Sequence, residues 1–161
     1  MILRLALGML GANCYVVFDQ VGGEAAVVDP GGPDPAPLQE VLQEHQLSVP
    51  YLLNTHGHFD HVAGNAKLRQ DPVRLGIHPN DKDLLLAGGG AAMFGLEIPA
   101  PPGPDLDLRD GTILEIGKRR MHVLHTPGHT PGSISLHIPE ESALLTGDTL
   151  FKGGVGRTDL P

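Results

Sequence analysis

The feature that most restricts the fold of this chain is a six-residue stretch, His56-Gly-His-Phe-Asp-His61, which holds three imidazoles and one carboxylate. It directly follows the short apolar run 51–54, so we expect a strand that ends just before it. In an extended chain His56 and His58 point to the same side, because side chains alternate with a period of two. Two neutral imidazoles side by side suit a borderline-soft divalent metal ion. The stretch therefore favours a fold in which a strand end delivers metal ligands.

Asp60 and His61 lie just beyond this pair, where we expect the chain to turn into a short helix that runs from about residue 60 to about residue 69. They could face a neighbouring ion instead of the same one. Asp60 also has a structural alternative, because aspartate caps helix N-termini. Gly57 leaves room for a metal ion and a substrate between the two imidazoles. Four potential ligands in six residues favour a metal site over a purely structural cluster.

Two further candidate ligands follow apolar runs later in the chain. His129 lies in Thr126-Pro-Gly-His-Thr-Pro-Gly-Ser133, where a Pro-Gly turn would hold the imidazole at the end of a strand. Asp148 lies in Thr146-Gly-Asp-Thr-Leu-Phe151. Its two carboxylate oxygens could bridge two metal ions.

The apolar patterning of the remaining chain predicts a mixture of strands and helices. Helical spacing of leucine and valine predicts a helix over about 36–47, and a helical turn or two is expected over 81–87. Residues 88–104, rich in Gly, Ala and Pro, are expected to form a mobile loop or a broken helix, which could rim a substrate cleft. The expected strands are 2–7, 14–18, 24–28, 51–54, 73–77, 112–117, 120–125, 132–138 and 142–146.

Composition limits the function classes. The 161 residues suit one domain, 1–161, and the formal net charge of −8 argues against non-specific nucleic-acid binding, which relies on neutralising phosphates. Aromatic residues make up 4% of the chain, so a base-stacking platform is not expected. No run of 18 apolar residues occurs, so we expect no membrane partner, and we expect no signal peptide. A single cysteine excludes an internal disulfide and fits a cytoplasmic location; the oligomeric state is not readable from the sequence.

The series His56-x-His58-x-Asp60-His61, His129 and Asp148 resembles the ligand series of the metallo-β-lactamase superfamily. The resemblance runs from Asn13-Cys-Tyr15 and Asp29-Pro-Gly-Gly32 to the end, and 147–161 are similar to the glyoxalase II-like (hydroxyacylglutathione hydrolase) branch. It implies an α+β fold, an αββα sandwich with a two-metal site at its edge. In that fold the closing strands, a helix and one more histidine come from a later segment, so we expect this chain, which stops at Pro161, to lack them.

The resemblance also implies roles for the candidate ligands. It places His56, His58 and His129 on a first metal ion, Asp60 and His61 on a second, and Asp148 between the two. Zn²⁺, two per chain, is the default cofactor, and imidazole and carboxylate ligands also admit iron or manganese. The implied reaction is hydrolysis of a small-molecule thioester such as S-lactoylglutathione by a metal-bridging hydroxide, with Asp60 orienting that hydroxide or accepting its proton.

Four residues near the candidate ligands have two interpretations each. Asp29 could accept a hydrogen bond from a ligand imidazole, or it could only initiate the Pro-Gly-Gly turn. Thr55 and Thr130 could each support a ligand with the hydroxyl group or simply shape a turn. In the family a basic residue at the position of Arg157 can bind the carboxylate of the substrate, and the alternative is a surface salt bridge.

Three other functions remain in competition at this stage. A persulfide dioxygenase-like relative would hold one iron with His56, His129 and Asp148 and would consume oxygen. A β-lactamase or phosphodiesterase fits less well with the acidic composition and the absence of an expected secretion signal. A carboxylate bridge by Asp148 is also unlike the β-lactamases proper, for which the resemblance leads us to expect a cysteine on the second metal ion. A metal-stabilised binding module without catalysis is the remaining alternative.

Overall fold

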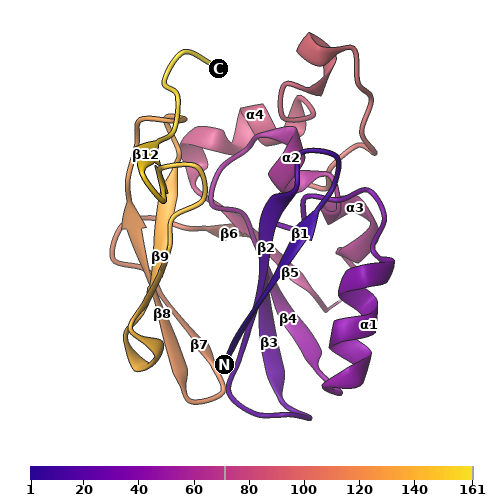
Figure 1. Cartoon of the computed structure of the whole chain (residues 1–161), viewed down its shortest axis with the longest axis vertical. Coiled ribbons are helices and arrows are strands. Elements are labelled where there is room, and N and C mark those ends of the chain that lie inside the picture. Colours follow the sequence, from indigo (N-terminus) through magenta and orange to yellow (C-terminus); the bar gives the residue numbers. More distant parts are fainter. Residues whose placement is uncertain (71, 161) are drawn as a thin grey trace.

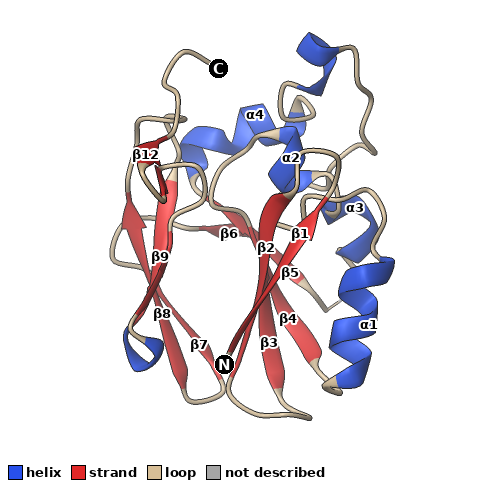
Figure 2. Cartoon of the chain, viewed as in Figure 1, coloured by secondary structure: helices blue, strands red, loops and turns tan. Residues whose placement is uncertain are grey.

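Two β-sheets packed face to face form the centre of the molecule, and helices cover the outer face of the first sheet (Figure 1). The computed structural model describes residues 1–70 and 72–160. Figure 2 shows that the helices gather on one side and at one end of the sandwich, apart from one short helical turn at the far end of the second sheet. The chain therefore forms three consecutive layers, helix, sheet and sheet, of an αββα sandwich. In the described part, no helix covers the outer face of the second sheet.

The first sheet has the strand order β1-β2-β3-β4-β5-β6. Its first three strands are antiparallel neighbours, whereas β3, β4, β5 and β6 run parallel to one another. The strands are β1 (Ile2–Leu7), β2 (Ala12–Phe18), β3 (Glu24–Val28), β4 (Ser48–Leu53), β5 (Arg74–Ile77) and β6 (Leu106–Asp107).

The second sheet is antiparallel with the order β10-β9-β8-β7, and a small hairpin of two strands follows it. Its strands are β7 (Ile113–Ile116), β8 (Arg119–His125), β9 (Ile134–Ile138) and β10 (Ala143–Leu145), and the hairpin is β11 (Leu150–Phe151) with β12 (Gly154–Val155).

The helices are short and connect the strands of the first sheet. Helix α1 packs Leu38 against that sheet, whose outer face carries a second apolar cluster with Val16 and Leu75. The helices are α1 (Ala36–Glu44), α2 (Phe59–Val62), α3 (Asn65–Leu68) and α4 (Lys82–Leu86), with 3-10 turns η1 (Pro79–Asp81), η2 (Ala91–Phe94) and η3 (Pro139–Glu141). No described helix is both long and apolar enough to cross a membrane.

The main core fills the space between the two sheets. Val28 and Leu53 of the first sheet pack with Met121, Ile134 and other apolar side chains of the second, and all four are fully buried. Strands β7 and β8 alternate between buried and more exposed residues, which is the expected signature of strands with one face toward a core. The sandwich therefore gives the loops at its edges a rigid base.

The observed elements differ from the sequence expectations in a few places. The helix expected over about 60–69 is divided into α2 and α3, because Gly64 between them donates its N–H to the carbonyl of Pro30 at 2.8 Å. A Cβ at Gly64 would also collide with that carbonyl oxygen. Helix α1 ends at Glu44 instead of 47, and the loop 88–104 contains η2. The strands β6, β11 and β12 were not expected.

Candidate metal centre

One edge of the sandwich gathers the loops that follow several strands. The parallel strands β3, β4 and β5 end at this edge, and the loops after β8 and β10 reach it from the second sheet (Figure 1). Chain segments far apart in sequence therefore meet there: the backbone N–H of Ile134 donates to the carbonyl of Thr55 at 2.9 Å. All six predicted metal ligands lie in these loops or in α2.

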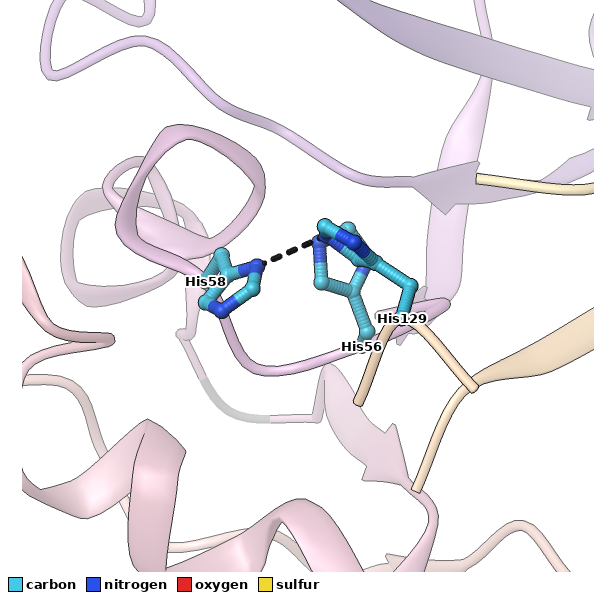
Figure 3. Close-up of side chains that lie close together, drawn as sticks. All are labelled: His56, His58 and His129. Atoms are coloured by element: carbon cyan, nitrogen blue, oxygen red, sulfur yellow. Dashed lines mark hydrogen bonds between the residues drawn. The ribbon is translucent and has the colours of Figure 1, made fainter. Parts of the chain in front are cut away.

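The structure brings His56, His58 and His129 together as one buried group (Figure 3). One ring nitrogen of each lies within 4.8 Å of those of the other two, which is the span of a shared ion. The Nδ1 of His58 is 2.9 Å from the Nε2 of His129. The first predicted ligand set is thus assembled without further movement of the backbone.

The hydrogen bonds around His56 fix which of its nitrogens is free to bind a metal ion. The Thr55 hydroxyl donates its proton to Oδ2 of Asp29 at 2.6 Å. It can therefore only accept from Nδ1 of His56, which is 3.1 Å away. This assigns the proton to Nδ1 and leaves Nε2 with a lone pair. That Nε2 is buried and finds no hydrogen-bond partner among the described residues, as expected of a ligand atom.

His129 is held in the same way by a different acceptor. Its Nδ1 lies 2.8 Å from the backbone carbonyl of Arg157, and a carbonyl can only accept. The proton therefore sits on Nδ1, which leaves Nε2, 2.9 Å from Nδ1 of His58, as the acceptor. Anchoring of the distant ring nitrogen by an oxygen is the usual way in which proteins orient metal-binding histidines.

A second group consists of His56, His61 and Asp148, again with ligand atoms within 4.8 Å of one another. The Nε2 of His61 is 3.2 Å from Oδ1 of Asp148, and the other carboxylate oxygen, Oδ2, is 3.6 Å from Nε2 of His129. Asp148 thus stands between the two groups, which is the position that a bridging ligand needs.

Asp60 lies beside the second group. Its Oδ2 is 3.6 Å from Nε2 of His61, and its side chain is partly exposed. The alternative role as a helix cap is not seen, because His58 occupies the N-cap position of α2 and no side chain there makes a capping hydrogen bond.

Asp29 fulfils both roles that its position suggested. Its fully buried carboxylate accepts from the backbone N–H and the hydroxyl of Thr55 and from Nδ1 of His61, at 2.7, 2.6 and 3.0 Å. Its φ of 53° also starts the turn into Pro30. Because the Nδ1 of His61 is used in this way, its Nε2 is directed toward Asp148.

The charges around the cluster shift its pKa values in opposite directions. Burial, reinforced by the neighbouring imidazoles, holds the pKa of His56 well below its usual range. Burial alone would also lower the pKa of His61, but the carboxylates of Asp29, Asp148 and Asp60 outweigh burial and raise it to about 10. Burial opposes ionisation of Asp148, yet the hydrogen bond and charge of His61 bring its pKa below the ordinary value. The neutral imidazole of His56 offers a lone pair, and the carboxylates around His61 attract positive charge. Together they suit a bound cation.

One important residue was missed at the sequence level. Asp81, expected only to begin a helical segment, is fully buried and connects two ligand loops. Its Oδ2 accepts from the N–H of Gly57 and the hydroxyl of Thr130, at 2.8 and 2.7 Å, and its Oδ1 accepts from the N–H of Gly132 at 2.6 Å. Thr130 is therefore a supporting hydroxyl. The sequence did carry a signal, because Asp81 follows β5 closely. The carboxyl ends of the parallel strands β3, β4 and β5 lie at the same edge of the sheet, where the candidate ligands gather.

Replacing Asp81 by Asn is expected to weaken metal binding without changing a ligand. Whichever way the amide is oriented, its NH₂ faces the N–H of Gly57 or of Gly132. An unsatisfied buried donor costs about 1–3 kcal/mol of stability. Loss of a residue that supports the metal ligands lowers metal affinity by about 10- to 100-fold. Chelator competition and chemical unfolding measure the two effects. Asp83→Asn, which changes an exposed residue of α4, is the control; equal metal affinity in the two variants would contradict the role of Asp81.

The candidate ligands open into a cleft of about 340 Å³, which lies within the size range of small-molecule sites. His58, Asp60, His129 and Asp148 contribute to its lining. Arg157 also lines it, but its guanidinium is paired with the carboxylate of Asp159 at 2.6 and 2.7 Å. The predicted salt-bridge alternative is thus present at this arginine.

Comparison with known proteins agrees with this geometry. The model of the Metallo-beta-lactamase superfamily matches residues 7–161. Hydroxyacylglutathione hydrolase GloC of Haemophilus influenzae is 38% identical over 161 residues, which cover 92% of this chain and 71% of that protein.

Two solved structures are similar over almost the whole chain. The crystal structure of BLEG-1 B3 metallo-beta-lactamase superimposes with a TM-score of 0.89 at 34% identity. The match covers 100% of this chain and 78% of that chain. The crystal structure of TTHA1623 in a di-iron-bound form gives a TM-score of 0.86 at 37% identity, with 99% of this chain and 78% of that chain covered.

Proposed function

The chain belongs to the metallo-beta-lactamase superfamily, and we propose that it is a metal-dependent hydrolase that cleaves small-molecule thioesters such as S-lactoylglutathione. The observation that supports this proposal most is the set of three buried histidines whose ring nitrogens converge, two of which, His58 and His129, line the cleft. The similarity to a hydroxyacylglutathione hydrolase supports the choice of a thioester.

The residues present fit a pair of metal ions. We assign His56, His58 and His129 to one ion and His61 and Asp60 to the other, with Asp148 between them. A divalent metal bound there would supply a water of lowered pKa, about 7 in favourable cases, and polarise a carbonyl group. We propose zinc, and the di-iron form of a similar structure makes iron the first alternative to test.

The protein groups would prepare the site for the reaction. Asp29 and Thr55 keep the protons of His61 and His56 on Nδ1, so that both Nε2 atoms face the site. Asp60, partly exposed at the cleft, is placed to orient the attacking water or accept its proton. A thiolate is a good leaving group, so no strong general acid is needed.

Two further assignments belong to this proposal. Arg157 is assigned to the carboxylate of a substrate, which would have to replace Asp159 as its partner. We also propose that the protein works in the cytoplasm, because its one cysteine, Cys14, is buried and unpaired, as is common in a reducing compartment.

Metal analysis beside a hydrolysis assay tests the proposal. Metal-loaded protein should cleave S-lactoylglutathione, and Asp60→Asn should lower turnover by about 100- to 10,000-fold, as loss of a general base does. Glu40→Gln, on the exposed face of α1, should leave turnover unchanged. Oxygen uptake with glutathione persulfide and no thioester cleavage would instead support the dioxygenase alternative. A fully metallated protein that is inert toward both would support a binding module.

A further inference from the structure

The cleft above the candidate metal centre has an apolar wall that the proposed hydrolysis does not require. Met93 and Phe94 of η2 lie 64% and 56% exposed, although large apolar side chains are costly to leave in water. The ring of Phe94 packs on that of Phe59, with centroids 5.5 Å apart, so the wall continues down to the residue that follows the ligand His58. The apolar side chains around the cleft include Leu10, Phe59, Leu84, Met93, Phe94 and Phe151.

Glutathione itself is a poor match for this wall. It carries charged groups at both ends, and burying a charge without a partner is costly. Among the described residues that line the cleft, Arg157 is the only lysine or arginine, and Asp159 already pairs with it. A charged thiol component would therefore lie toward the open side near Arg157, and the apolar wall would be left for the acyl group.

We propose that the site selects thioesters with an apolar acyl chain, which lies against Met93, Phe94 and Phe59. This inference rests on the proposed function for its reaction, but the apolar contact is a separate property of the chain. An exposed apolar patch that continues into a concave site with convergent polar groups is typical of ligand binding. The turn η2, which carries Met93 and Phe94, lies between Gly90 and Gly95, whose φ values are 77° and 67°.

A series of S-acylglutathiones with acyl chains from two to ten carbons tests the preference while the thiol stays constant. The value of kcat/KM should rise by up to about fourfold per methylene until the cleft is filled. The double variant Met93→Ser/Phe94→Ser should flatten this dependence. Val21→Ser, an exposed apolar position outside the cleft, should retain it. A chain-length profile that is flat in the unsubstituted protein would overturn the inference and leave thioester hydrolysis intact.

Binding of S-alkylglutathiones separates the inference from the proposed reaction, because a thioether cannot be hydrolysed. Calorimetry with S-methyl to S-octyl compounds should give a Kd that falls by up to about fourfold per methylene, and the double variant should lose this trend. Chain-dependent binding without turnover of any thioester would sustain the apolar site and refute the proposed hydrolase. Binding that is independent of chain length would overturn the inference.

Discussion

Replacing Asp148 by Asn is expected to remove most of the metal and nearly all of the turnover while the fold persists. The carboxylate offers one oxygen to Nε2 of His61 at 3.2 Å and the other toward Nε2 of His129 at 3.6 Å. Asn removes the negative charge and presents an N–H to one of these nitrogens, whose lone pair it would occupy. Loss of a residue that only hydrogen-bonds to a metal ligand lowers metal affinity by up to about 100-fold. We expect Asp148→Asn to lower metal affinity by more than that.

Elemental analysis and steady-state kinetics on the same preparation measure both effects. Asp107→Asn changes an exposed carboxylate that pairs with Arg109 and is the matched control. A circular dichroism spectrum like that of the unsubstituted protein would show that the fold is retained. Undiminished turnover in Asp148→Asn would remove this residue from the mechanism.

Asp29→Asn should also weaken metal binding strongly, although Asp29 touches no substrate in the proposal. The amide of Asn must direct its NH₂ either at the N–H of Thr55 or at the Thr55 hydroxyl and Nδ1 of His61. We expect metal affinity to fall by about 10- to 100-fold and the free energy of unfolding by about 1–3 kcal/mol. The backbone does not explain such a loss, because Asn tolerates a φ of 53°.

Two comparisons make this prediction specific. Asp29→Gly keeps the left-handed backbone but removes every acceptor, so it should lose metal affinity at least as strongly as Asp29→Asn. Thr55→Val removes the hydroxyl that orients His56 and should weaken metal binding while leaving the contact between Asp29 and His61. Metal affinity that is preserved in Asp29→Gly would show that Asp29 serves only the turn.

Much of the arrangement of the candidate site could be predicted because its candidate ligands are concentrated in sequence and follow strand ends. The stretch from His56 to His61 contains four candidate ligands within six residues, and a Pro-Gly turn directly precedes His129, so both could be recognised from the local sequence. Asp148 was also predictable, and the structure explains its Gly147 neighbour. Gly147 adopts a φ of 50°, and a Cβ there would collide with the hydroxyl of Thr55.

The parts that were missed depend on contacts between distant segments. The division of the predicted helix follows from the contact of Gly64 with Pro30, more than thirty residues earlier. Strand β6 has two residues and is defined by its pairing with β5. Two residues are too few to show the alternation of apolar and polar side chains that predicts a strand. Asp81 gains its role only because Gly57 and Gly132 approach it from two different loops.

Anomalous X-ray diffraction from a crystal of the zinc-loaded protein tests the central claim most directly. We predict one peak at about 2.0–2.1 Å from Nε2 of His56, Nδ1 of His58 and Nε2 of His129. A second peak should lie next to His61 and Asp148. Well-ordered side chains at these five positions with no peak between them, at a zinc concentration that saturates the protein in solution, would contradict the metal centre and the hydrolysis that depends on it.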